Sequence, residues 1–86
     1  MSLQANTLFA ELIIQLKADG LPTASKKLDY LLRDISWNSD LDFLAGFGRE
    51  MKQTKETCWE RMSAESQQAF LIVAQRINRS WPELGL

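Results

Sequence analysis

The sequence contains no histidine and only one cysteine, Cys58. Because histidine is the commonest general base, its absence excludes Ser-His-Asp and Cys-His catalysis and histidine-containing zinc sites. A single cysteine likewise excludes a four-cysteine zinc site and an intrachain disulfide. Phosphate-binding glycine motifs are also missing, since neither Gly-x-x-x-x-Gly-Lys-Ser/Thr nor Gly-x-Gly-x-x-Gly occurs. We therefore expect a protein that is not an enzyme, with no cofactor, metal ion or small-molecule substrate.

Long apolar runs and an excess of charge of one sign are lacking as well. No run approaches the roughly 18 apolar residues that indicate a membrane span, and the N-terminus has no secretory signal pattern. We therefore expect a cytoplasmic protein. Ten Lys and Arg stand against eleven Asp and Glu, for a formal net charge of −1. Because phosphate contacts dominate nucleic-acid affinity and usually require a basic excess, this balance disfavours nucleic acid as the partner.

What the sequence does have is enough apolar content for one core. The chain has 86 residues, of which 45% are hydrophobic, and this predicts a single domain over residues 1–86. Apolar residues recur at three-and-four spacing, and no segment alternates with period two. The fold class expected is therefore all-α, a compact domain of four helices, orthogonal or bundle-like, with a short extra helical turn possible near 57–62.

The first two helices are predicted at 6–19 and from Thr23 to about Ile35. Gly20 suits the left-handed position after a helix end, with Leu21 next to it and Pro22 discouraging continuation. Thr23 is the expected N-cap of the second helix. The core-facing positions expected in the two helices are Leu8, Phe9, Leu12, Ile13 and Leu16, then Ala24, Leu28, Leu31, Leu32 and Ile35.

Ser39 and Ser63 are the expected N-caps of the third and fourth helices, and Pro82 is expected to end the fourth. Gly48 is predicted to leave room for another helix, whereas Gly46 is predicted only to weaken its own helix. Between 54 and 62 two readings stay open, a continued third helix or a new turn capped by Thr57; a break near 55–57 is favoured. The expected inner positions are Leu44, Phe47, Met51 and Cys58, then Phe70, Val73, Ala74, Ile77 and Trp81.

Few residues remain as candidates for chemistry. Cys58 lies within three residues of Lys55 and Arg61, which favour a reactive thiolate if they lie near its sulfur, but a structural free cysteine is the commoner case. Asp40 and Asp42 are expected to stabilise the start of the third helix rather than bind a cation.

Four apolar residues are not used by the predicted core and are the candidate interface: Ile14, Tyr30, Trp37 and Ile72. Three of the four helices show a second apolar edge, and aromatic residues flanked by arginine are typical of interface anchors. We therefore expect a small helical protein–protein interaction or regulatory module whose partner is another protein or a second copy in a homodimer. The alternative is a small nucleic-acid-binding regulator that uses Lys26, Lys27 and Arg33 on the second helix.

Overall fold

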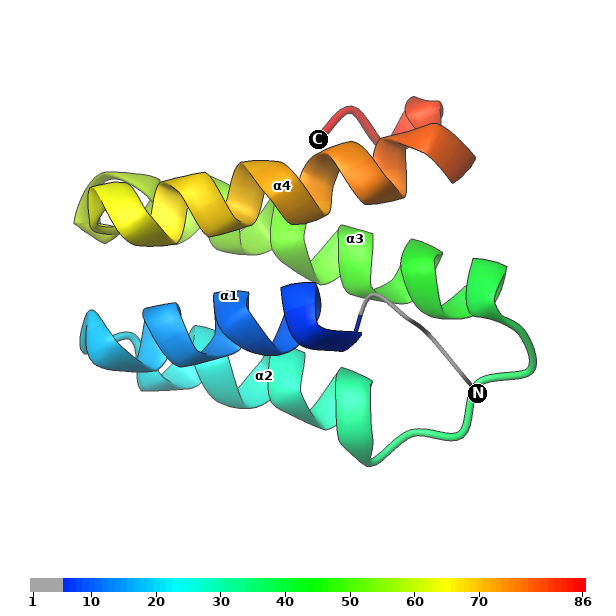
Figure 1. The fold of residues 1–86 in the computed structure, drawn as a ribbon, viewed down its shortest axis with the longest axis horizontal. Helices are drawn as coiled ribbons and strands as arrows, with labels where there is room; N and C mark the ends of the chain where they lie inside the picture. The colour runs from blue at the N-terminus through cyan, green and yellow to red at the C-terminus, as the bar shows by residue number, and fades with distance from the viewer. Residues whose placement is uncertain (1–5) are drawn as a thin grey trace.

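A computed structural model describes residues 6–86 and shows an antiparallel bundle. Within that range the chain forms four α-helices, two short 3₁₀ turns and no strand, which confirms the all-α four-helix class. The α-helices are α1 (Asn6–Ala18), α2 (Pro22–Arg33), α3 (Asp40–Cys58) and α4 (Ala64–Ser80). Each helix runs opposite to the one before it along the bundle (Figure 1). None of these helices combines the length and the apolar character needed to cross a membrane.

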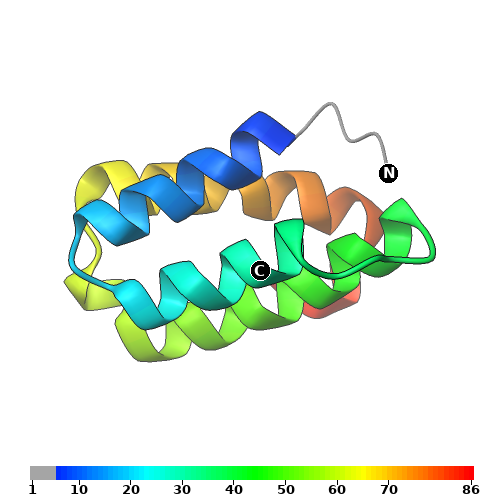
Figure 2. The ribbon, with the colours of Figure 1, turned by 90° about the horizontal axis from the view of Figure 1, so that it is seen from below.

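The four helices form two pairs that share one core. α1 packs against α2 and α4, and α3 packs against the same two helices, so that α1 and α3 are diagonal to each other. The α1–α2 pair lies under the α3–α4 pair in Figure 1, and the view from below in Figure 2 shows α1 and α2 side by side. The turns at 19–21 and 59–63 are at one end of the bundle, and the longer connection at 34–39 is at the other.

A cluster of aromatic rings fills the space between the diagonal helices. Phe9 of α1 meets the rings of Phe43 and Phe47 of α3, with centroid distances of 5.1 and 5.0 Å in edge-to-face arrangements. All three side chains are fully buried. Because such pairs add about 0.5–1.5 kcal/mol beyond the burial of their area, this cluster stabilises the position of α1 across the core from α3.

The end of α1 has the geometry that the sequence predicts. Gly20 has a φ of +74°, its N–H donates to the Lys17 carbonyl, and the Leu21 N–H donates to the Leu16 carbonyl. These two bonds make a Schellman motif, in which a residue without a side chain favours the left-handed turn. The predicted inner face of α1 is confirmed except at Leu8, which is exposed at the side of the helix.

The predicted limits of α2 are wrong at both ends. The helix begins at Pro22, with Leu21 as its N-cap residue, and no side chain caps it. Proline suits the first helical position, because its fixed φ is helical and the N–H it lacks would have no partner there. The helix ends at Arg33 rather than near Ile35, so residues 34–39 form the connection to α3.

The predicted serine caps of α3 and α4 are both confirmed. The Ser39 hydroxyl accepts the Asp42 N–H at 3.1 Å, and the Ser63 hydroxyl accepts the Ser66 N–H at 3.2 Å. Between these helices α3 continues to Cys58, beyond the predicted break at 55–57, and a 3₁₀ turn then covers Trp59–Arg61. Thr57 does not cap that turn, because its hydroxyl donates back to the Gln53 carbonyl within α3.

A carboxylate at the end of α1 adds a second cap to α4. Asp19 accepts the Ser63 N–H at 2.9 Å and also accepts the hydroxyl of the fully buried Ser66. The Ser66 hydroxyl and the Ser63 N–H hold the pKa of Asp19 below its ordinary value, against a smaller opposing effect of burial. Asp19 therefore joins the two helix pairs where α1 ends and α4 begins.

Gly46 has a packing role that corrects the prediction made for it. A side chain there would meet the indole ring of Trp37, with Cζ3 at only 2.9 Å from the added carbon. The ring is held in this position because Trp37 Nε1 donates to the Leu31 carbonyl at 2.8 Å. The prediction for Gly48 is confirmed, since it faces Ile77 of α4 and Leu84 of the C-terminal turn.

The C-terminus folds back onto the bundle after α4. Pro82 ends α4 as predicted but also opens a 3₁₀ turn over Pro82–Leu84. Trp81 Nε1 donates to the Leu41 carbonyl at 2.9 Å, and the Asn78 side-chain amide donates to the Leu86 carbonyl at 2.9 Å. These bonds hold the last residues against α3 and α4.

Candidate interaction surface

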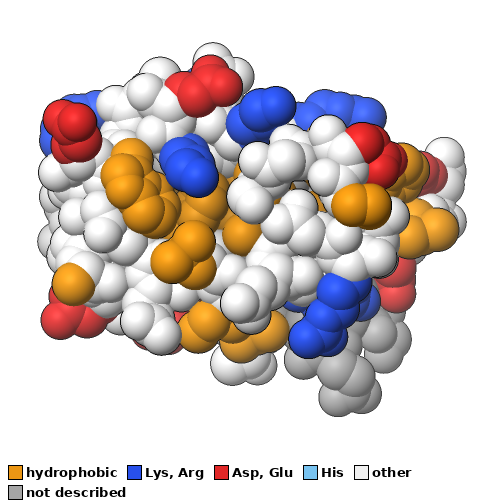
Figure 3. All heavy atoms as spheres, turned by 90° about the horizontal axis from the view of Figure 1, so that it is seen from above, with side chains coloured by type: hydrophobic (Ala, Val, Ile, Leu, Met, Phe, Trp, Pro, Cys, Tyr) orange, Lys and Arg blue, Asp and Glu red, His pale blue; other side chains and the backbone are white. Residues whose placement is uncertain are grey.

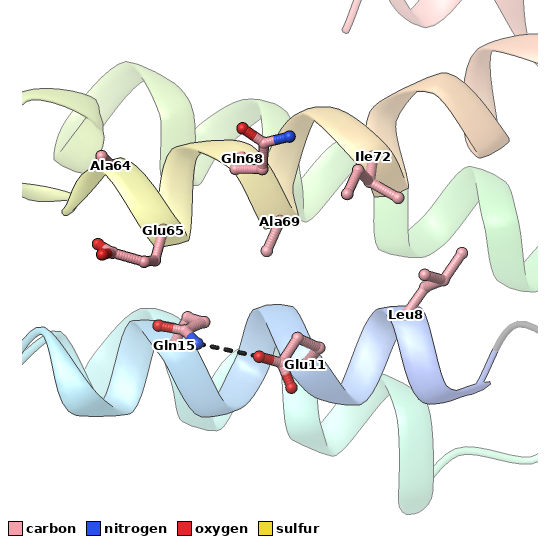
Figure 4. A pocket seen from close by; sticks show the side chains of 8 residues that line it. All are labelled: Leu8, Glu11, Gln15, Ala64, Glu65, Gln68, Ala69 and Ile72. Carbon is pink, nitrogen blue, oxygen red and sulfur yellow. Dashed lines mark hydrogen bonds between the residues drawn. The ribbon is translucent and has the colours of Figure 1, made fainter.

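A groove of about 440 Å³ runs between α1 and α4 on the outside of the bundle. Figure 4 shows side chains from both helices projecting into it, with Leu8 and Ile72 facing each other near one end. Eight residues line the groove: Leu8, Glu11, Gln15, Ala64, Glu65, Gln68, Ala69 and Ile72.

The groove combines apolar walls with two carboxylates. Leu8 and Ile72 are both exposed large hydrophobic side chains. On the α1 side, Glu11 accepts a hydrogen bond from the Gln15 amide at 2.9 Å (Figure 4), while Glu65 lies in the first turn of α4, where negative charge is favoured. The groove therefore offers apolar contact and acceptor oxygens to whatever covers it.

Low charge distinguishes the two helices that form this groove. α1 carries two charged residues and α4 three, against four in the shorter α2 and seven in α3. From Ser66 to Gln75 α4 has no charged residue at all. Figure 3 shows a different face, the one over α3 and α4, where separate hydrophobic patches reach the surface between basic and acidic groups. We refer to the outer sides of α1 and α4 together, with the groove, as the α1/α4 face.

The structure exposes three of the four candidate interface residues. Ile14 is 58% exposed, Tyr30 55% and Ile72 41%. Trp37 is different and corrects the expectation that it faces outward. It is partly buried against the core, and its ring lies edge-on to Phe43 with centroids 6.0 Å apart, because the chain turns inward once α2 ends at Arg33.

The three exposed candidates do not form one patch. Ile72 lines the α1/α4 groove, whereas Ile14 lines a smaller groove of about 270 Å³ between α1 and α2. Tyr30 lies on α2. Sequence reasoning missed Leu8, which it placed in the core, and it did not single out Leu71, which is also exposed on α4. The scarcity of charge in α1 and α4 was the feature of the sequence that distinguishes this face.

The basic edge of α2 is smaller than the sequence suggested. Lys26 and Lys27 are exposed on α2. Arg33, however, pairs with Asp29 one turn earlier, with 2.6 Å between Nε and the carboxylate oxygen. Because this carboxylate offsets one of the three positive charges, fewer remain for phosphate contacts.

The residues considered for chemistry lie apart from the groove. Cys58 is partly buried at the end of α3, and its sulfur accepts a hydrogen bond from Arg61 at 3.4 Å. Asp40 and Asp42 occupy the first turn of α3. Within residues 6–86 no three Cys, Asp or Glu side chains come together in a way that could hold a metal ion.

The chain matches no family model, and no curated protein or solved structure is similar to it.

Proposed function

We propose that this protein is a non-enzymatic interaction module that binds another polypeptide through the α1/α4 face. The observation that carries the proposal is the pairing, on two adjacent helices, of exposed apolar side chains with a low density of charge. Leu8, Leu71 and Ile72 are all exposed on these helices, and Ile14 is exposed on the flank of α1. Depletion of charged residues is what distinguishes the centre of an interface from ordinary surface.

The energetics favour covering this face. Apolar surface removed from water contributes about 25 cal/mol per Å². A domain of 86 residues has little surplus stability, because a large share of its surface stays in water. A bound partner would therefore stabilise the folded state by mass action as well as perform the interaction.

A photo-crosslinking amino acid at position 72 tests the proposal directly. In cells of the source organism, we expect irradiation to give a discrete crosslinked band from position 72. The matched control carries the same amino acid at position 52, where Lys52 is exposed on α3. We expect no discrete band from that position, because α3 exposes a charged outer side.

The absence of any band from position 72, or equal bands from both positions, would contradict the proposal. The mass of the adduct identifies the class of partner, because an adduct of twice the chain mass contains a second copy and any other mass contains a different polypeptide.

A further inference from the structure

We propose that the partner of the α1/α4 face is a second copy of this chain, with the α4 helices of the two copies packed antiparallel about a two-fold axis at Ile72. This inference rests on the proposed function and specifies its partner. It is carried by the order of charged and apolar side chains along α4.

The position of Ile72 in α4 makes the helix self-complementary. Glu65 precedes Ile72 by seven residues and Arg79 follows it by seven. Because seven residues are nearly two helical turns, all three side chains lie toward the same side of the helix, about 10 Å apart along its axis. A two-fold axis at Ile72 therefore brings Glu65 of each copy opposite Arg79 of the other.

The same axis pairs further groups. Gln68 and Arg76 are each four residues from Ile72, so Gln68 of one copy comes opposite Arg76 of the other. A parallel arrangement would instead place Glu65 against Glu65 and Arg79 against Arg79. Like charges opposite each other are destabilising, so charge complementarity selects the antiparallel orientation. The helix dipoles of the two α4 helices also oppose each other in this orientation.

Ile72 and Leu8 form the apolar centre of the proposed contact. Ile72 of the two copies would meet at the centre, and Leu8 lies across the groove from Ile72 (Figure 4). On α4 itself, the residues one turn from Ile72 on the same side are Gln68 and Arg76, because the residues between them include the buried Phe70, Val73 and Ala74. Polar and charged groups then form the margin of the contact, which is the usual anatomy of an interface.

The size of the molecule is compatible with such a contact. The total accessible surface is 5229 Å². A standard interface covers about 800 Å² on each partner, which would be a modest fraction of this surface. Because the net charge is only −1, overall repulsion between copies is small.

Charge reversal tests both the partner and the orientation. We expect sedimentation equilibrium of the wild-type chain, at concentrations on the order of 100 μM, to show a dimer. Glu65→Arg alone and Arg79→Glu alone should each raise the dissociation constant by about tenfold or more, since two like-charge contacts replace two ion pairs. An equimolar mixture of these two variants should associate again, because position 65 of each chain then meets an opposite charge at position 79 of the other.

Two matched controls carry the same charge changes on α3. Glu56→Arg and Lys52→Glu, both at exposed positions, should leave the dissociation constant unchanged. Far-ultraviolet circular dichroism of every variant should show the helicity of the wild type. If one variant alone loses helicity, the mixture still tests the contact. A chain that is unfolded for other reasons would not associate with the second variant.

A wild-type chain that remains monomeric at these concentrations overturns the inference, as does a mixture that associates no better than its components. Crosslinking from position 72 keeps the two proposals apart. An adduct with a different polypeptide, together with a monomeric chain, retains the proposed function and rejects the second copy. No adduct at all rejects both.

Discussion

The α1/α4 face and the α2/α3 side of the same bundle differ in their outer surfaces far more than in their inner ones. All four helices bury apolar side chains in the shared core. On the outside, α2 and α3 carry four and seven charged residues, while α1 and α4 carry two and three. The outer surface of α1 and α4 is therefore poorer in charge than that of α2 and α3, although Tyr30 of α2 and Leu41 of α3 are also exposed.

This difference shows that core packing does not account for all the apolar residues of α1. A helix that is apolar on nearly every side is normally buried on nearly every side. Here Ile14 is exposed although Phe9, Leu12 and Leu16 of the same helix are fully buried. The contact proposed at Ile72 does not cover Ile14, which lines the separate groove between α1 and α2.

The largest expected effect separates the inner from the outer side of α1. Phe9→Ala should lower the free energy of unfolding by about 3–5 kcal/mol, because it removes the ring that contacts Phe43 and Phe47. Ile14→Ala should change it by less than about 1 kcal/mol in the monomer. Urea unfolding followed by circular dichroism measures both. Equal losses for the two variants would place Ile14 in the core and remove the contrast between the two sides.

A smaller effect is expected where α3 receives Trp37. Gly46→Ala should destabilise the protein by about 1–3 kcal/mol through overpacking against the indole ring. The sign should reverse in a Trp37→Ala background, where alanine retains only its advantage in helix propensity, about 1 kcal/mol. A double-mutant cycle in urea measures this coupling, and additive effects would show that the ring does not limit the space at Gly46.

Asp19→Asn, at the junction between the two helix pairs, should lower the free energy of unfolding by about 1 kcal/mol at neutral pH. This is the usual contribution of a helix cap. Because its folded-state pKa is lowered, Asp19 stabilises the protein above its unfolded pKa of about 3.9, and the contribution is lost as the pH falls through the folded pKa.

The wild type and Asp19→Asn should therefore converge in stability in acid, as measured by urea unfolding at a series of pH values. Asp34→Asn, on the connection at the opposite end of the bundle, removes the same charge and is the matched control. Parallel curves for the wild type and Asp19→Asn would show that the carboxylate has no special environment.

The smallest effect is expected on the charged side of the molecule. The double variant Lys26→Ala, Lys27→Ala should change the free energy of unfolding by less than about 0.5 kcal/mol, since both side chains are exposed. Retention of the wild type on heparin, measured at increasing salt, should be weak and should not depend on these lysines. Strong retention that falls steeply with salt and disappears in the double variant would favour nucleic-acid binding through α2.

Local chemistry made the helices and most of their ends predictable. Gly20, Ser39 and Ser63 each act through groups within a few residues, so their roles could be deduced from the order of residues alone. The start of α2 was misplaced because Pro22 and Thr23 both suit a helix N-terminus and the sequence does not decide between them.

The roles of Gly46 and Asp19 could not be predicted, because each depends on a partner brought close by tertiary packing. Trp37 reaches Gly46 across a connection of irregular structure, and Asp19 reaches α4 from the far end of α1. The α1/α4 groove was missed for the same reason. Ile72 was singled out as an exposed residue, but its neighbour across the groove, Leu8, follows the same helical periodicity as the buried residues of α1.

The Asp19 junction also has a kinetic consequence. Its two contacts span 44 and 47 residues of sequence, so we expect them to form late in folding. Contacts that form late in folding have little influence on the rate of folding and a large influence on the rate of unfolding. We therefore expect the loss of Asp19 to increase the rate of unfolding, and so shorten the lifetime of the folded molecule, with little change in the rate of folding.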